Sequence, residues 1–339
     1  MRRSLPPSAL RHAAAAGLAL LAAAGAAAAS PFDPDDAGWE GLGELRDAAR
    51  ADLGAERVAI VTEVDWGALR EGDGLLVVHP EHPLDADELA AFVEAGGRVA
   101  LLDDFGAGAR TLARWKVERV PAPAHPAETL RGRAALPIAE PRGDVGPRGA
   151  TAVHPTLVET PRLMTNHPTG LRQPKMATVL ALRDEDGSEV PLALAGVLGR
   201  GRLLAMGDPS AVMNEMWGYA GNRAFGRHLA RWLVEDEAAG RTGGKLVVAS
   251  GRIEETGSFS GRPPLAREAA RRLGGAAEAL REAASHGLPA PLAFALALAV
   301  TLAAVVRTWQ SAGKRYVPRP PAFVDPAAAA RASAPEDHR

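Results

Sequence analysis

A strand–helix–strand unit constrains the fold of this chain more than any other part of its sequence. Residues 74–79 and 98–102 are short, continuous apolar runs, the kind that forms strands covered on both faces of a sheet. Between them, Asp85 can cap a helix in which Glu88 completes the capping box, and a Gly-Gly pair ends that helix. Two strands joined by one helix through short loops form a right-handed parallel crossover, so the sequence predicts an α/β fold.

Further apolar runs predict the other strands of the same domain. They occupy residues 57–62, 178–182, 190–197 and 202–206. An Asp-Gly pair separates the second run from the third, and glycines separate the third from the fourth. Such residues form hairpin turns, so we expect the last three strands to follow one another closely.

Two helices and two peripheral segments complete the predicted domain. A short helix is expected near 109–115 and a longer one over 222–234, where Asn222 is a candidate N-cap. The Pro- and Gly-rich residues 121–149 predict a long surface excursion, and residues 245–249 predict an edge strand. The domain is therefore expected over residues 38–235.

Residues 1–29 have the pattern of an export signal. Arg2, Arg3 and Arg11 precede an apolar, alanine-rich stretch at 13–26, and Ala27 to Ala29 supply the small residues of a cleavage site. An uncleaved anchor is the alternative. The short, mostly alanine run favours cleavage.

Near the other end, residues 288–306 form an apolar run without a charge. As a helix this run would be about 28 Å long, close to the hydrocarbon thickness of a bilayer. We predict a transmembrane helix there, preceded by a linker and helical stalk at 236–287 and followed by a disordered cytoplasmic tail at 307–339. The export signal then predicts a single-pass protein of the inner (cytoplasmic) membrane, in contact with the lipid bilayer, whose main domain is extracytoplasmic.

Composition excludes several kinds of chemistry. The 39 Lys and Arg residues are balanced by 41 Asp and Glu residues, so the sequence predicts no nucleic-acid partner. The chain has no cysteine, which excludes disulfides, cysteine nucleophiles and thiolate metal sites.

Several motifs together resemble a known family. The unit at 85–106, which ends in Leu-Leu-Asp-Asp-Phe-Gly, is similar to the helix, Gly-Gly, strand unit of glutamine-amidotransferase-like domains. Gly201-Arg-Leu-Leu-Ala-Met-Gly-Asp-Pro-Ser210, Asn214 and the Gly-Asn-Arg-Ala-Phe of 221–225 extend the similarity. Over roughly residues 57–235 the chain resembles the bacterial family called domain of unknown function 4350, related to auxiliary subunits of gliding-type ABC transporters.

The resemblance implies a fold and a setting. The fold it implies is flavodoxin-like or glutamine-amidotransferase-like, a mostly parallel sheet with helices on both faces. The setting it implies is the bacterial envelope, with other membrane or envelope proteins as partners, including a MoxR-type ATPase system.

Polar residues that follow the predicted strands form the candidate ligand-binding site. Where catalytic members of the amidotransferase-like fold carry a nucleophile, this sequence has two aspartates, and it has no Gly-x-Ser-x-Gly elbow. Open α/β sheets bind ligands at the carboxyl ends of their strands. Because the nucleophile is missing, we expect no catalytic residue, and we predict neither a metal nor a cofactor. The candidate ligand-binding residues are Asp103, Asp104, Asn166, His167, Asp208, Asn214 and Asn222.

Each of these residues also has a structural interpretation. Asp103 or Asp104 can cap the next helix, and the segments around His167 and Asp208 have the composition of turns. His79 and His82, beside the two acids, would form a metal site if their imidazoles converged. The prolines around them favour an extended surface turn instead.

The leading functional hypothesis is a membrane-anchored, extracytoplasmic binding or scaffold protein that is not an enzyme. It would be a non-catalytic subunit of a bacterial envelope or transport-associated complex. The alternative is a hydrolase that uses Asp104, His167 and Asp208, with or without a metal. The two hypotheses differ in whether these three side chains converge.

Overall fold

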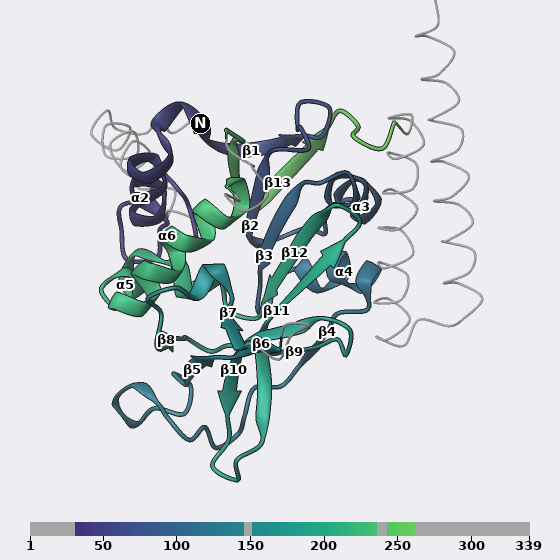
Figure 1. Ribbon diagram of the computed structural model, residues 1–339. Helices are drawn as coiled ribbons and strands as arrows, with labels where there is room; N and C mark the ends of the chain where they lie inside the picture. Colours follow the sequence, from purple (N-terminus) through teal and green to yellow (C-terminus); the bar gives the residue numbers. More distant parts are fainter. Residues whose placement is uncertain (1–30, 146–150, 236–242, 262–339) are drawn as a thin grey trace, which may run out of the picture. The chain divides into compact units, whose positions relative to one another are not determined.

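Nine strands form the central sheet of this protein, which the computed structural model describes over residues 31–145, 151–235 and 243–261. Their order is β1-β13-β2-β3-β12-β11-β10-β5-β8 (Figure 1). The first five strands in this order are parallel to one another. They are β1 (Val58–Asp65), β13 (Leu246–Thr256), β2 (Gly74–Pro80), β3 (Arg98–Leu102) and β12 (Gly201–Met206).

The other four strands of the sheet are antiparallel to their neighbours. They are β11 (Glu189–Leu198), β10 (Ala177–Arg183), β5 (Ile138–Pro141) and β8 (Leu163–Met164). Two small antiparallel sheets accompany them. One pairs β4 (Glu118–Val120) with β9 (Gly170–Arg172), and the other pairs β6 (Gly143–Val145) with β7 (Thr151–Val153).

The expectation of a flavodoxin-like or glutamine-amidotransferase-like sheet, mostly parallel, is therefore wrong. The nine-stranded sheet is mixed, with four parallel and four antiparallel pairings, and only a few helices accompany it in the described residues. Short turns are the physical reason. Gly187 (φ 85°) and Gly199 (φ 59°) lie in the turns that flank β11, and turns this short reverse the chain, whereas parallel neighbours need a long crossover.

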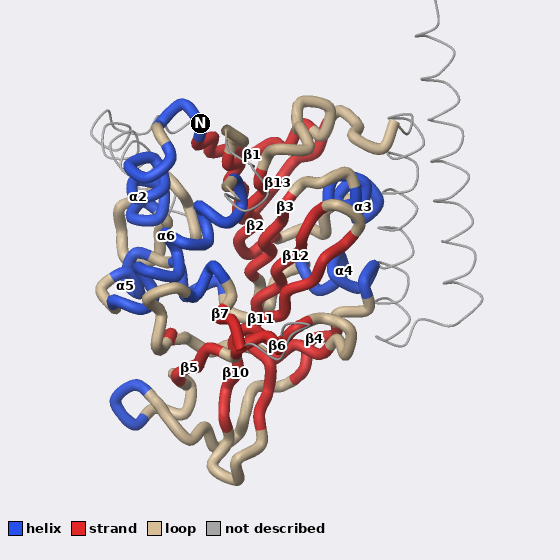
Figure 2. Tube along the Cα trace, in the orientation of Figure 1, coloured by secondary structure: helices blue, strands red, loops and turns tan. Residues whose placement is uncertain are grey.

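Five helices of the described residues lie beside the sheet, three on one side and two on the other (Figure 1, Figure 2). On one side are α2 (Gly43–Leu53), α5 (Asn214–Trp217) and α6 (Ala220–Val234); on the other are α3 (Ala86–Glu94) and α4 (Gly108–Leu112). Single turns of 3₁₀ helix connect the elements. They are Ala55–Arg57, Ala113–Trp115, Leu130–Gly132, Pro155–Leu157 and Pro209–Val212.

Alternate side chains of the parallel strands pack in two separate hydrophobic cores, one on each face of the sheet. In β2, Leu76 and Val78 belong to the core that contains residues of α2 and α6, while Leu75 and Val77 belong to the core that contains Phe92 of α3. Successive side chains of a strand point to opposite faces, so a strand that is apolar throughout is buried on both. All five residues of β3 are buried in this way.

β13 lies inside the sheet and not at its edge. It pairs in parallel with β1 on one side and β2 on the other, and Ala249 lies opposite Val61 and Val77. The edge strand expected at 245–249 is thus an interior strand, and the boundary expected at residue 235 leaves it out. Because the local pattern of an apolar run does not specify its neighbours, the sequence could not place it.

The capping residues of two helices differ in how well the sequence predicted them. Asp85 caps α3 as expected, accepting from the N–H groups of Asp87 (3.0 Å) and Glu88 (3.2 Å). Glu88 does not close a capping box; its buried carboxylate accepts four hydrogen bonds from residues 258–260. Asn222 lies within α6 and does not cap it.

Several predicted segments lie outside the described residues. These are the signal at 1–29, the hydrophobic run 288–306, the tail 307–339 and most of the stalk between residue 262 and the run. Within the described part of the chain, no helix combines the length and the apolar character needed to cross a membrane.

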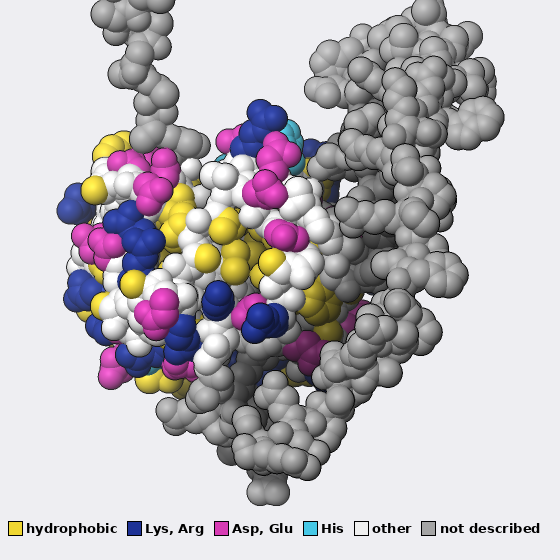
Figure 3. Space-filling model, turned by 90° about the horizontal axis from the view of Figure 1, so that it is seen from above, with side chains coloured by type: hydrophobic (Ala, Val, Ile, Leu, Met, Phe, Trp, Pro, Cys, Tyr) yellow, Lys and Arg dark blue, Asp and Glu magenta, His cyan; other side chains and the backbone are white. Residues whose placement is uncertain are grey.

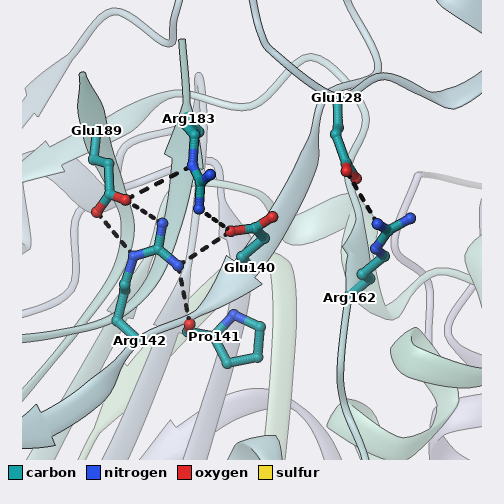
Figure 4. A network of polar contacts seen from close by, with 7 residues as sticks. All are labelled: Glu128, Glu140, Pro141, Arg142, Arg162, Arg183 and Glu189. Carbon is teal, nitrogen blue, oxygen red and sulfur yellow. Dashed lines mark hydrogen bonds and ion pairs between the residues drawn. The ribbon is translucent and has the colours of Figure 1, made fainter. Parts of the chain in front are cut away.

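A network of ion pairs joins the strands of the antiparallel half (Figure 4). Arg142, which follows β5, contacts Glu189 of β11 (2.8 Å) and Glu140 of β5 (3.3 Å), and Arg183 of β10 also contacts Glu140 (2.7 Å). These side chains are partly exposed, so each pair contributes at most about 1 kcal/mol, and the network mainly reinforces the strand register. The face seen in Figure 3 shows acidic and basic side chains interspersed, without a continuous patch of either sign.

The interior position of β13 leads to a prediction about fragments. We expect residues 31–261 to fold as a unit and residues 31–235 to be unfolded or aggregated, because removing β13 exposes the facing edges of β1 and β2. Circular dichroism, urea titration and limited proteolysis measure the difference.

Two point variants provide a matched control within β13. Val248→Asp places a charge in the core and should unfold the 31–261 fragment, whereas Arg252→Asp changes an exposed side chain and should not. A cooperative urea transition of the 31–235 fragment would contradict the interior role of β13.

Candidate functional site

The carboxyl ends of β2 and β3 bring one histidine and two aspartates together. Val78 of β2 lies opposite Leu102 of β3, so the residues that follow them, His79 and Asp103, meet at the same edge of the sheet. The Nδ1 atom of His79 lies 3.4 Å from Oδ1 of Asp103 and 3.2 Å from Oδ1 of Asp104. Both contacts are ion-pair contacts without hydrogen-bond geometry.

The backbone of His79 adopts an unusual conformation that aims its ring. Its φ is +46°, in the left-handed region that few non-glycine residues occupy. The imidazole stacks on Phe32, with 5.0 Å between ring centroids. His79 therefore lies beside Asp103 and Asp104. His82, three residues further along the chain, is exposed and lies outside this cluster.

Asp103 organises the chain that follows β3. Its side chain is fully buried, and its two oxygens accept hydrogen bonds from the N–H groups of Gly106 (2.9 Å) and Gly108 (2.8 Å). Arg119, from β4, adds a charged contact of 2.7 Å. Asp103 thus holds the loop before α4 in place. It is not the N-cap of α4, as the sequence had allowed, because Ala107 occupies that position.

Asp104 is the more accessible of the two aspartates. Its Oδ1 accepts from the N–H of Phe105 at 2.6 Å and faces His79. Of its side chain, 11% is exposed, and the neighbouring Phe105 is 68% exposed. Within the cluster, His79 (side chain 30% exposed) and Asp104 are therefore the groups that a partner molecule can reach.

The electrostatics of the cluster favour internal neutralisation. The contact with Asp104 raises the pKa of His79 against the opposing effect of its burial, and the negative charges of Asp103 and Glu81 add to the rise. Burial raises the pKa of Asp103, although Arg119 and His79 oppose it. Arg119, together with His79 when its imidazole is protonated, therefore compensates the charge of the acids.

The same cluster offers the donor types that divalent metals use. His79, Asp103 and Asp104 present three potential ligand atoms within 4.8 Å of one another. One observation disfavours a metal: Arg119 already contacts Asp103 at 2.7 Å and compensates its charge. The geometry fits an ion-pair cluster better than a metal centre.

Asp208, which follows β12, is buried completely. Its Oδ1 accepts from the N–H of Ser210 (2.8 Å) and its Oδ2 from the N–H of Asn166 (2.9 Å). Burial raises the pKa of Asp208 to about 7, and the nearby charge of Asp104 contributes, while the two backbone donors oppose the rise. Asp208 therefore fixes the position of the loop that contains Asn166.

A pocket of about 540 Å³ opens beside that loop. Asn166 and His167 line it, together with Arg131, Arg133 and residues of α5. His167 is exposed, has a φ of +53°, donates its N–H to the carbonyl of Ala135 (2.8 Å) and contacts Asn166 through Nδ1 (2.8 Å). Within the described residues, its ring contacts neither Asp104 nor Asp208.

Asn214 and Asn222 lie apart from this group and serve the fold. Asn214 bonds the carbonyls of Asp36 (3.0 Å) and Gly38 (2.6 Å) and accepts from the first turn of α2. Asn222 is buried. Its side-chain oxygen accepts from the N–H of Met164, and its amide group donates to the carbonyls of Met164 and Ala211. Their hydrogen-bonding groups are used inside the protein.

Sequence reasoning missed the arginines of both sites. Arg119 reaches Asp103 from β4, and Arg131 and Arg133 line the pocket from a separate loop. No local pattern marks them, because arginine is frequent throughout this chain and only the tertiary fold selects these three.

The fold and the site together define a class of protein: an α/β domain with a mixed sheet and a polar site at the carboxyl ends of its parallel strands. The family model described as domain of unknown function (DUF4350) matches residues 34–230, more than half of the chain, and the chain belongs to this family. The resemblance read from the motifs is confirmed. The relationships to glutamine amidotransferases and to ABC transporters remain predictions.

Other comparisons give distant similarities only. No curated protein matches the chain. Among solved structures, the similarity to the N-terminal domain of mmIFT52 covers 48% of this chain and 78% of that domain's chain, at 13% identity and a TM-score of 0.36. A β-galactosidase from Bacillus circulans sp. alkalophilus covers 59% and 27%, at 12% identity and a TM-score of 0.33.

A further similarity is to the exo-β-1,4-mannosidase Op5Man5 from Opitutaceae bacterium strain TAV5. It covers 48% of this chain and 25% of the enzyme, at 15% identity and a TM-score of 0.29. The chain thus spans about a quarter of each glycosidase, and similarity of this degree assigns no activity to it.

The buried acid leads to a prediction about pH. The folded state holds a proton on Asp208 up to about pH 7, well above the pKa of an aspartate in the unfolded chain. The stability that this proton contributes is therefore present at low pH and is lost as pH rises through 7; His79 and Asp103, whose pKa values are also raised, act in the same direction. We expect the free energy of unfolding to fall by about 1 kcal/mol from pH 6 to pH 8 because of Asp208.

Urea titrations at both pH values measure this difference. Asp208→Asn carries no titrating group, so its pH dependence should be smaller even though losing an acceptor lowers its stability overall. Asp186→Asn is the control, because the pKa of the exposed Asp186 is lowered and lies outside this range. An Asp208→Asn variant with the full pH dependence would contradict the assignment.

Proposed function

We propose that this domain recognises a ligand without changing it chemically, and that the ligand binds in the pocket beside Asn166 and His167. One observation carries the proposal: the buried carboxylate of Asp208 is committed to fixing the Asn166 loop at the rim of a pocket of about 540 Å³. A pocket of this volume suits a small molecule or a few residues of a partner. A rigid rim favours recognition because less conformational entropy is lost on binding.

The buried acids at the strand ends are poorly suited to catalysis. Asp103 and Asp208 each use both oxygens to accept backbone N–H groups of their own loops. Both side chains are also buried, so a substrate cannot reach them. A hydroxyl beside a histidine does occur, since Thr156 Oγ1 lies 2.8 Å from Nδ1 of His154. Thr156 is completely buried, however, and a substrate cannot reach it.

The hydrolase alternative requires Asp104, His167 and Asp208 to act in one network. Asp104 contacts His79, and His167 contacts Asn166. Asp208 is linked to His167 only through the neighbouring Asn166, whose backbone N–H it accepts. General acid–base catalysis needs the base within hydrogen-bond reach of the reacting group, so this arrangement supports binding over hydrolysis.

The setting of this binding function is proposed from the sequence. Residues 1–29 motivate export, and the uncharged run 288–306 motivates retention at the inner membrane. The domain would then act outside the cytoplasm as a non-catalytic subunit of an envelope or transport-associated complex. Its partners would be other membrane proteins, with a MoxR-type ATPase system among the candidates.

The non-catalytic role predicts that the purified protein turns over no simple hydrolase substrate. We expect p-nitrophenyl acetate, p-nitrophenyl phosphate and p-nitrophenyl glycosides to be released at the rate measured in buffer alone. His82→Ala is the matched control for His167→Ala, because His82 is also exposed but lies outside the pocket. Hydrolysis that survives in His82→Ala and is lost in His167→Ala would establish the hydrolase instead.

The proposed location predicts the behaviour of two fusions. Alkaline phosphatase is active only outside the cytoplasm, so a fusion after residue 261 should be active, and green fluorescent protein after residue 339 should fluoresce inside the cell. An inactive phosphatase fusion that is expressed normally would place the domain in the cytoplasm. N-terminal sequencing of the mature protein tests cleavage after Ala29 separately.

A further inference from the structure

The loop that forms one wall of the pocket is tightly closed. Thr129 and Pro137 form an isolated β-bridge, and Leu130 and Leu136 are joined by a backbone hydrogen bond of 2.8 Å. The turn between them contains Arg131 with a φ of +55°, a left-handed conformation that costs free energy in any residue except glycine. The backbone bond from His167 to Ala135 attaches this loop to the Asn166 loop.

Within the described residues, two arginines of this loop have no side-chain partner. Most arginines of the described residues contact a carboxylate or a carbonyl, as Arg119, Arg142 and Arg172 do. No hydrogen bond or ion pair joins the guanidinium groups of Arg131 and Arg133 to any other residue in the part of the chain that the structure describes. Both nevertheless line the pocket.

The remaining lining of the pocket combines apolar and polar surface. Leu130, Leu136, Met216 and Tyr219 supply apolar surface, and Asn166 and His167 supply hydrogen-bonding groups. Glu215 is the one acidic residue of the lining. The charges therefore sum to one net positive charge when His167 is neutral and two when it is protonated, which favours an anion.

We propose that this pocket binds a small organic anion, with its carboxylate or phosphate on the guanidinium groups of Arg131 and Arg133 and its apolar body against Leu136, Met216 and Tyr219. Guanidinium groups match carboxylate and phosphate geometry through paired N–H donors. Glu215 accepts a hydrogen bond from a hydroxyl or amino group of the same ligand and disfavours ligands with many negative charges. The inference rests on the proposed function of the pocket and names the class of its ligand.

A second basic hollow, on α6, supports this choice by contrast. It has a volume of about 430 Å³ and contains Arg223, Arg227 and Arg231. Arg227 and Arg231 both contact Asp52 of α2, and Arg223 donates to the carbonyl of Trp217. Because these guanidinium groups already contact a carboxylate or a carbonyl, we expect the α6 hollow to bind an anion more weakly than the pocket at Arg131 and Arg133.

The test measures binding of defined probes to the full chain by isothermal titration at pH 7 and low salt. Phenyl phosphate and benzoate carry an anion on an apolar ring, inorganic phosphate carries the anion alone, and benzyl alcohol carries the ring alone. We expect the two aromatic anions to bind most tightly. Added salt should weaken their binding, because charge contributes to the affinity. The Arg131→Gln, Arg133→Gln double variant should bind both aromatic anions with an affinity lower by roughly tenfold or more.

Arg70→Gln is the matched control. Arg70 is an exposed arginine without a side-chain partner in the described residues, and it lies outside the pocket lining. We expect this variant to bind the probes as the unaltered protein does. All three substituted arginines are exposed and unpaired, so equal thermal midpoints should show that the variants are folded.

Three outcomes would overturn the inference. They are no measurable binding of either aromatic anion, equal binding by the double variant, or benzyl alcohol binding as tightly as benzoate. The last result would leave the pocket as a binding site for an uncharged ligand, so the proposed function would survive. Hydrolysis of phenyl phosphate to phenol, detected in the same samples, would overturn the proposed function instead.

Discussion

Burial of the central parallel strands on both faces is the constraint on which the rest of this structure depends. All five residues of β3 are buried, and β2 and β12 are nearly as inaccessible. Such strands accept few polar groups along their length, because an unpaired polar group in a dry interior is costly. Polar residues are consequently concentrated where the strands end, and His79, Asp103 and Asp208 all lie there.

The strand-end acids serve two purposes that are separate in space. Asp103 joins His79 and Arg119 in an ion-pair cluster that holds the loop before α4. Asp208 instead fixes the Asn166 loop and, through it, one wall of the pocket. The charge of Asp104 raises the pKa of Asp208, so the two groups are linked electrostatically although their loops differ.

Local patterns predicted the elements of the fold well and their arrangement poorly. The apolar runs at β2, β3, β10, β11 and β12 were placed correctly, as was the Asp85 cap of α3. The mostly parallel sheet that the resemblance implied was wrong, because the short turns at Gly187 and Gly199 reverse the chain and make β10, β11 and β12 antiparallel. The interior place of β13 depends on contacts with β1 and β2, which lie near the opposite end of the domain's sequence, and no local pattern encodes them.

The sequence alone determined the family, the strand ends at which Asp103, Asp104 and Asp208 lie, and the absence of thiol chemistry. Only the tertiary structure decided which side chains meet there. It paired His79 with the acids, placed His167 in a separate pocket and used Asn214 and Asn222 inside the fold. The physical reason is that hydrophobic periodicity specifies which face of an element is buried, whereas contacts between polar side chains depend on distances set by the packing of the whole domain.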